Sequence, residues 1–176
     1  MELTKKDKIV KYVVYCLVLA VCSLLQNVGG LFLEIGGARC FLLVPVAVLL
    51  TIDEDEKVAA LIGFFAGLLW DITSVQHMGY NAIFIMLMCF VSSCLVTYAF
   101  RDTFMFSMVS AVGATVLYCF VYWLVFVVFA GVSDGVWSVL YFYIPCAVYT
   151  GVVTPVFYKL LQPLKKKLNK AYEIQQ

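Results

Sequence analysis

Six long apolar runs divide the chain, at residues 9–28, 39–52, 58–75, 81–100, 103–130 and 136–161. About 20 apolar residues in a helix are enough to cross the hydrocarbon core of a bilayer, which is about 30 Å thick. The composition agrees, because 64% of the 176 residues are apolar and 13% are charged, against about 45–50% and about 25% in soluble domains. The sequence therefore predicts an all-α integral membrane protein, a bundle of six transmembrane helices that forms a single domain over residues 1–176.

Charge and residue counts exclude several classes of function. A net charge of +1 is too small for a dedicated nucleic-acid-binding protein. One histidine and seven cysteines without a CxxC pair give no metal-ligand pattern, so we expect no metal and no cofactor. The sequence also lacks the two buried aspartates or the serine with a histidine base of an intramembrane protease, and a nucleotide-binding loop. We therefore expect a protein that is not an enzyme.

The distribution of basic residues predicts the orientation of the bundle. Six crossings place both termini on the same side, and 11 of the 12 lysines and arginines then share that side, with Arg39 as the exception. Because cytoplasmic flanks collect positive charge, we expect both termini in the cytoplasm and a basic cytoplasmic tail at 162–176. Lys165, Lys166 and Lys167 in this tail are expected to lie at the membrane surface, where anionic lipid head groups attract each basic residue by about 1 kcal/mol.

The second and third runs are short for a full span. Their strictly apolar stretches, 40–52 and 58–69, hold 13 and 12 residues, which is about 20 Å of helix. They either extend through polar ends or form a short hairpin inside the bundle, around the acidic turn at 51–57. We favour extension, since neighbouring helices can shelter polar side chains such as Asp71. The turn itself is expected to be solvated or to meet a basic partner.

A stripe of small residues marks the third helix. Ala59, Gly63, Gly67 and Asp71 recur every four residues, so they lie along one face of a helix. Glycines on such a face let another helix approach closely, which drives helix association in lipid. The stripe is expected to pack against the protein's own helices or, alternatively, against a partner.

Asp71 is the one acid within an otherwise apolar helical run. A charge at the centre of a bilayer costs at least about 2.5 to 3.5 kcal/mol, which by default marks a functional residue. The predicted orientation, however, places Asp71 near the outer end of its helix. Its carboxylate is then expected to accept hydrogen bonds from backbone N–H groups at the start of the fourth helix, near Gly79 and Asn81. We favour this structural role over proton or ion transport.

Two short blocks resemble the rod shape-determining protein MreD family. The first block is ALIGFFAGLLWD at 60–71 and the second is MGYNA at 78–82, with Met78 and Tyr80 as variations on the family pattern. The last helix, with Ile144-Pro145 and Thr154-Pro155 before a basic tail, is also similar. One departure is Ala38-Arg39, where many members have a proline and an acid.

The resemblance implies a non-enzymatic scaffold in the plasma membrane of a bacterium, within the complex that elongates the cell wall. It implies as partners MreC, the cytoskeletal MreB, and the glycosyltransferase and transpeptidase of lateral wall synthesis. An alternative is the substrate-binding subunit of a vitamin uptake transporter, another six-helix class. In that case the ligand contacts come from Glu34, Asp71, Asn81 and Trp137. Tight binding of a vitamin favours the transporter, and copurification with MreC favours the scaffold.

The predicted orientation can be tested by labelling single cysteines with an impermeant thiol reagent, in a background without reactive native thiols. Asp55 and Arg101 are expected to face the cytoplasm, and His77 and Asp134 to face outward. Cysteines at 77 and 134 should therefore react in intact cells, and those at 55 and 101 only after permeabilisation. The opposite pattern would reverse the orientation.

Overall fold

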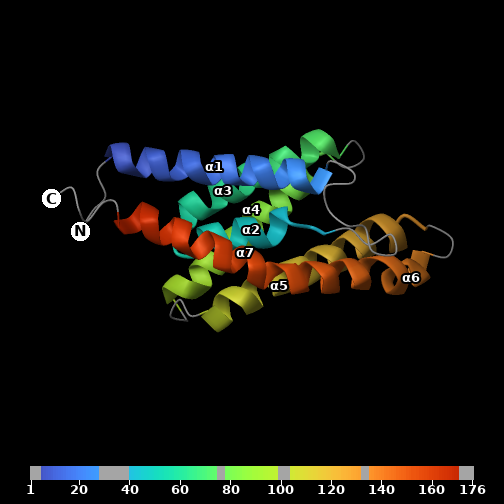
Figure 1. Ribbon diagram of the computed structural model, residues 1–176. Coiled ribbons are helices and arrows are strands. Elements are labelled where there is room, and N and C mark those ends of the chain that lie inside the picture. The colour runs from blue at the N-terminus through green and yellow to red at the C-terminus, as the bar shows by residue number, and fades with distance from the viewer. Residues whose placement is uncertain (1–4, 28–39, 75–77, 99–103, 132–134, 171–176) are drawn as a thin grey trace.

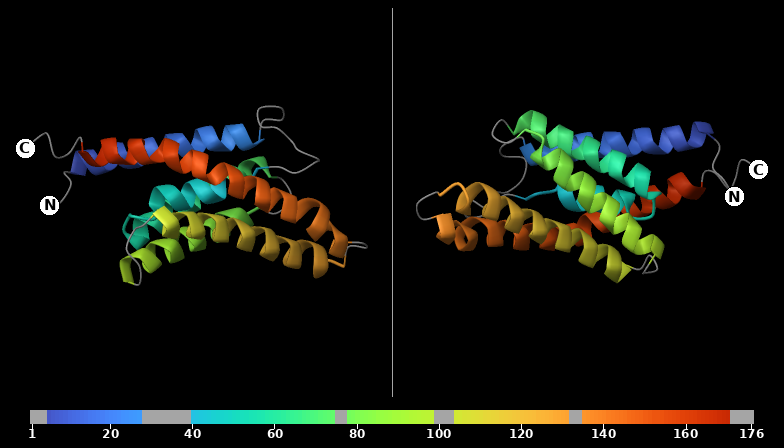
Figure 2. Two further views of the ribbon diagram at one scale, coloured as in Figure 1. Left: turned by 60° about the horizontal axis from the view of Figure 1, so that its bottom comes forward. Right: turned by 180° about the vertical axis from the view of Figure 1, so that it is seen from behind.

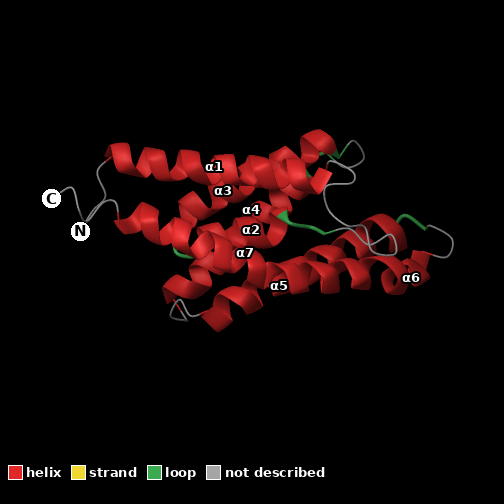
Figure 3. Cartoon of the chain, viewed as in Figure 1, coloured by secondary structure: helices red, strands yellow, loops and turns green. Residues whose placement is uncertain are grey.

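The computed structural model describes residues 5–27, 40–74, 78–98, 104–131 and 135–170, and the secondary structure within these ranges is helical (Figure 3). The helices follow the order of the apolar runs. The α-helices are α1 (Lys5–Asn27), α2 (Leu43–Thr51), α3 (Glu56–Thr73), α4 (Tyr80–Tyr98), α5 (Phe104–Trp123), α6 (Gly135–Ser138) and α7 (Ile144–Lys170), and two π-helical segments, η1 (Leu124–Val128) and η2 (Val139–Tyr143), continue α5 and precede α7.

The short helix α2 lies at the centre of the bundle. It packs against α1, α3, α4, α5 and α7, and Figure 1 shows it between α1 on one side and α5 and α7 on the other. All nine residues of α2 are buried. The first residues of α1 and the last residues of α7 lie at the same end of the bundle in each view of Figures 1 and 2.

Four of the helical stretches, rather than the six that the sequence predicts, are long and apolar enough to cross a membrane within the described residues. The other two are α2, which is too short, and α3, whose 18 residues include three charged side chains. The four stretches are Lys8–Asn27, Tyr80–Tyr98, Phe104–Val128 and Val139–Leu168.

The third run extends through its polar end as expected, whereas the second run does not. Helix α3 extends through its polar end to Thr73. Helix α2, in contrast, has nine residues, about 14 Å of helix at 1.5 Å per residue. It is buried inside the bundle, and the acidic turn connects it to α3, which has an exposed outer face. Helix α7 continues to Lys170, beyond residue 161, where the last apolar run ends. The first part of the expected tail at 162–176 is therefore helical.

The core forms where the apolar faces of the outer helices meet α2. Tyr15 and Leu19 of α1, Ile85 of α4 and Ala111 of α5 are fully buried against it. The outward faces of α1, α5 and α7 carry exposed aliphatic side chains, such as Leu17 at 61% exposure. The described interior also contains a small number of buried polar and charged side chains. The candidate sites are built from these side chains.

Candidate functional site

The small-residue stripe of α3 faces α4. A Cβ atom added to Gly67 would overlap the backbone of Asn81 and Ala82, and one added to Gly63 would lie 2.8 Å from the carbonyl oxygen of Ile85. The backbones of α3 and α4 therefore touch at these glycines, which only a residue without a side chain allows. The protein's own fourth helix covers this face.

Asp71 lies at the end of this stripe and is 4% exposed. Its Oδ2 atom accepts hydrogen bonds from the backbone N–H groups of Gly79 and Ala82, each at 3.0 Å. These N–H groups lie just before α4 and in its first turn, where helices lack internal acceptors. The carboxylate therefore caps α4, and its charge complements the helix dipole. Gly79 precedes α4 with φ of +92°, a backbone conformation that favours glycine.

Asn81 lies in the first turn of α4, and its side chain makes a contact of its own. The second backbone donor to Asp71 is Ala82, and the Asn81 side chain accepts a hydrogen bond of 2.7 Å from the Tyr118 hydroxyl on α5. Tyr118 stacks on Trp70 of α3 with ring centroids 5.0 Å apart. Asn81 therefore links α4 to α5 beside an aromatic cluster. The sequence did not single out Tyr118, because its position within an apolar run does not indicate which other helix it contacts.

The described residues expected for a vitamin site each have contacts of their own and do not line one common cavity among those found. Asp71 and Asn81 hold the internal contacts above, and Trp137 is 60% exposed on α6, which packs against η1 and η2. Glu34 lies outside the described residues. Across the described ranges, no three His, Cys, Asp or Glu side chains gather as a metal site needs.

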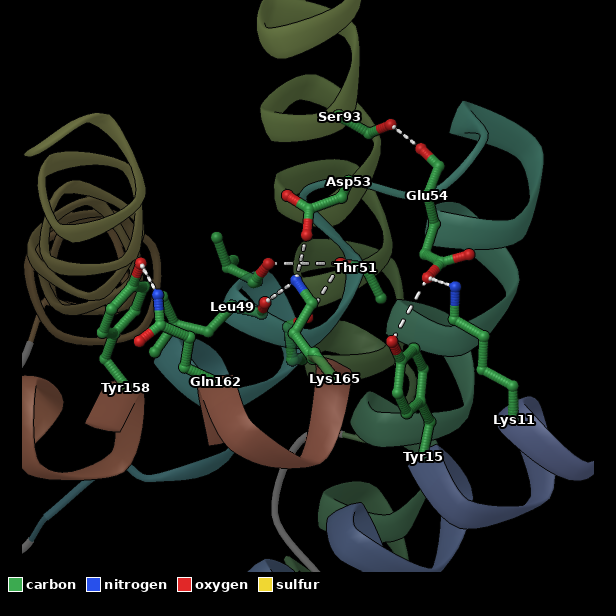
Figure 4. Close-up of polar contacts among 12 residues, drawn as sticks. Lys11, Tyr15, Leu49, Thr51, Asp53, Glu54, Ser93, Tyr158, Gln162 and Lys165 are labelled. Carbon is green, nitrogen blue, oxygen red and sulfur yellow. Dashed lines mark hydrogen bonds and ion pairs between the residues drawn. The ribbon is translucent and has the colours of Figure 1, made fainter. Parts of the chain in front are cut away.

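The acidic turn after α2 binds lysines of the chain itself. Lys11 of α1 forms an ion pair with Glu54 at 2.5 Å, and the Tyr15 hydroxyl donates to the same carboxylate at 3.2 Å. The Ser93 hydroxyl of α4 donates to the Glu54 carbonyl oxygen at 2.6 Å. Figure 4 shows these groups converging on the turn from different helices. The turn thus joins α1 and α4 at the end of α2, rather than being simply solvated.

Lys165 of α7 completes the arrangement at the end of α2. Its ammonium group forms an ion pair with Asp53 at 2.5 Å and donates to the Leu49 carbonyl oxygen at 2.9 Å (Figure 4). A cation at the C-terminal carbonyls of a helix satisfies acceptors that lack internal donors. The Lys165 side chain is 13% exposed, because it packs on the end of α2. Lys166 and Lys167 are exposed.

The other end of α2 has side-chain partners as well. The Gln26 side-chain oxygen on α1 accepts from the Leu43 N–H, and the Thr150 hydroxyl on α7 accepts from the Phe41 N–H, both at 3.0 Å. A buried backbone N–H without a partner is costly in an apolar interior. Gln26 and Thr150 thus let a helix end lie inside the bundle. A polar side chain within an apolar run is the signal that could have marked them.

Comparison with known proteins assigns the chain to a family. The family model for rod shape-determining protein MreD matches residues 6–168, nearly the whole chain. The chain therefore belongs to the MreD family. The comparisons with curated proteins and with solved structures find no significant match.

The contact between α3 and α4 generates a prediction for Gly67. A methyl group there overlaps the α4 backbone, so Gly67→Ala should lower the free energy of unfolding by about 1–3 kcal/mol. Gly113 of α5 is the matched control, because an added Cβ meets nothing within 4 Å. Gly113→Ala should keep or slightly raise stability. Thermal unfolding in detergent measures both, and equal midpoints would contradict the close approach.

The cap on α4 generates a prediction for Asp71. Asparagine keeps one acceptor oxygen for the Gly79 and Ala82 N–H groups, so Asp71→Asn should keep most of the stability and the rod-shape function. Leucine has no acceptor, so Asp71→Leu should lose about 0.5–2 kcal/mol. Detergent unfolding and restoration of rod shape in a deletion strain measure these effects. A folded Asp71→Asn protein that fails to restore shape would show that the charge itself is used.

Proposed function

We propose that this MreD-family chain is a non-enzymatic scaffold of the complex that elongates the bacterial cell wall. It acts as a multi-pass protein of the plasma membrane and contacts its partners through helix faces and loops. The family match supports a role in rod-shape determination. The observation that carries the scaffold role is an apolar groove on the outside of the bundle, between α1 and α7.

The groove has a volume of about 440 Å³. All the described side chains that line it are apolar or cysteine, and they come from the two outer helices alone. Both helices are candidate membrane spans, so the groove lies at membrane depth when they cross. Six residues come from α1 and four from α7, namely Val14, Leu17, Val18, Val21, Cys22, Leu25, Phe157, Leu160, Leu161 and Leu164.

The occupant that we propose is a transmembrane helix of MreC. At this depth a partner must satisfy its own backbone hydrogen bonds, which a helix does. Helices in lipid associate by close packing rather than by hydrophobic transfer, so a preformed groove favours a helix over a flat surface. The glycine stripe of α3 is not available for this purpose, because α4 covers it.

The predicted orientation would allow contacts on both sides of the membrane. The first residues of α1 and the last residues of α7 lie at one end of the bundle (Figure 1), and Lys11 and Lys165 lie at the same end beside the acidic turn. With this end in the cytoplasm, as the basic residues predict, MreB reaches it. The glycosyltransferase and transpeptidase then work beside the opposite end.

Site-specific photocrosslinking in cells tests this proposal. A photoreactive amino acid at Leu17 or Leu160, on the two walls of the groove, should yield an adduct with MreC. Leu61 of α3 and Val109 of α5 are matched controls, because each is 69% exposed but lies outside the groove. Equal adducts at all four positions, or adducts at the controls alone, would contradict the groove as the MreC contact.

A further inference from the structure

A second cavity, of about 170 Å³, lies between the acidic turn, the first turns of α5 and the C-terminal half of α7. Its described lining differs from that of the apolar groove, because polar side chains from three elements contribute. A single water needs about 10–15 Å³, so the cavity has room for a group of several heavy atoms. The lining residues are Leu49, Ile52, Asp53, Ser107, Tyr158, Leu161, Gln162, Lys165 and Lys166.

The charge of this lining is positive. Among the described residues that line the cavity, Asp53 is the one acid, and Lys165 compensates it through the ion pair at 2.5 Å. Lys166 adds a second cation that has no ion pair with another described residue. An anionic group in the cavity would therefore meet an uncompensated positive charge.

Hydrogen-bond donors line the same cavity. The Gln162 amide donates to the Tyr158 hydroxyl oxygen at 3.4 Å, and Figure 4 shows both side chains beside Lys165. The amide group of Gln162 and the ammonium group of Lys166 together suit the several oxygens of one phosphate group.

The position of the cavity indicates the source of that phosphate. It lies at the lysine-rich end of the bundle, where Phe104 of α5 packs edge-on against Tyr158 with centroids 4.9 Å apart. Aromatic rings and lysines at the end of membrane spans are typical of the bilayer interface. We propose that this cavity binds the phosphate of an anionic phospholipid head group, as a saturable site distinct from general attraction of the surface lysines. This inference does not depend on the MreC contact.

The thermal midpoint of the full-length protein in detergent tests the site, since a ligand of the folded state raises it. The probes are phosphatidylglycerol, phosphatidylcholine and inorganic phosphate. Phosphatidylglycerol should raise the midpoint in a saturable way, and phosphatidylcholine should raise it less. Inorganic phosphate should compete with the lipid.

The matched variants are Lys166→Gln and Lys167→Gln, which remove the same charge from neighbouring positions of α7. Lys166 lines the cavity and Lys167 does not. Lys166→Gln should weaken phosphatidylglycerol binding about tenfold or more, as for a lost charged hydrogen bond. Lys167→Gln should weaken it about fivefold or less. Gln162→Leu is a second cavity variant and should also weaken binding more than Lys167→Gln does.

Three outcomes would overturn the proposal. Equal weakening in Lys166→Gln and Lys167→Gln would show diffuse surface attraction. Equal binding of phosphatidylglycerol and phosphatidylcholine would show that negative charge is not selected. Binding of inorganic phosphate without binding of phosphatidylglycerol would assign the cavity to a soluble phosphate. None of these outcomes bears on photocrosslinking at Leu17 or Leu160, so the two proposals fail separately.

Discussion

The hydrogen bonding of the two ends of α2 is the constraint on which the rest of this structure depends. A nine-residue helix has four unpaired N–H groups and four unpaired carbonyl groups at its ends, and an apolar interior offers them no water. At the start of α2, Gln26 and Thr150 accept hydrogen bonds from backbone N–H groups. In its last turn, Lys165 donates a hydrogen bond to the carbonyl oxygen of Leu49. Because these side chains belong to α1 and α7, satisfying α2 also fixes where the first and last helices lie.

The acidic turn extends this arrangement to α4. Glu54 binds Lys11 and Tyr15 through its side chain and Ser93 through its carbonyl oxygen, while Asp53 binds Lys165. The side chains of Lys11 and Glu54 are each 7% exposed. Removing one partner of such a buried pair leaves the other charge uncompensated, which costs more stability than the intact pair contributes. The glycine stripe and these polar groups thus make contacts within the protein, and the outer faces of the described helices carry exposed apolar side chains.

Hydropathy predicted the helical segments well, because the length of an apolar run limits how far a helix can continue. It did not reveal that α2 is buried on all sides, since a run of 13 apolar residues suits a short interior helix as well as part of a span. The spacing of Gly63 and Gly67 identified the closely packed face, because four-residue periodicity is a local property. The roles of Thr150 and Lys165 were not predictable in this way. They bond to partners 109 and 116 residues away, and no local pattern encodes such a pairing.

The stability of Lys165→Met, compared with Lys167→Met, tests most directly whether α2 is held from its ends. The two changes remove the same charge from α7, but only Lys165 contacts Leu49 and Asp53. Unfolding in one detergent should show a loss of about 1.5–3 kcal/mol for Lys165→Met, as for a charged hydrogen bond. Lys167→Met should stay within about 0.5 kcal/mol of the unmodified protein. Equal stability of the two variants would contradict the account, because the contacts of Lys165 with Leu49 and Asp53 would then contribute nothing to stability.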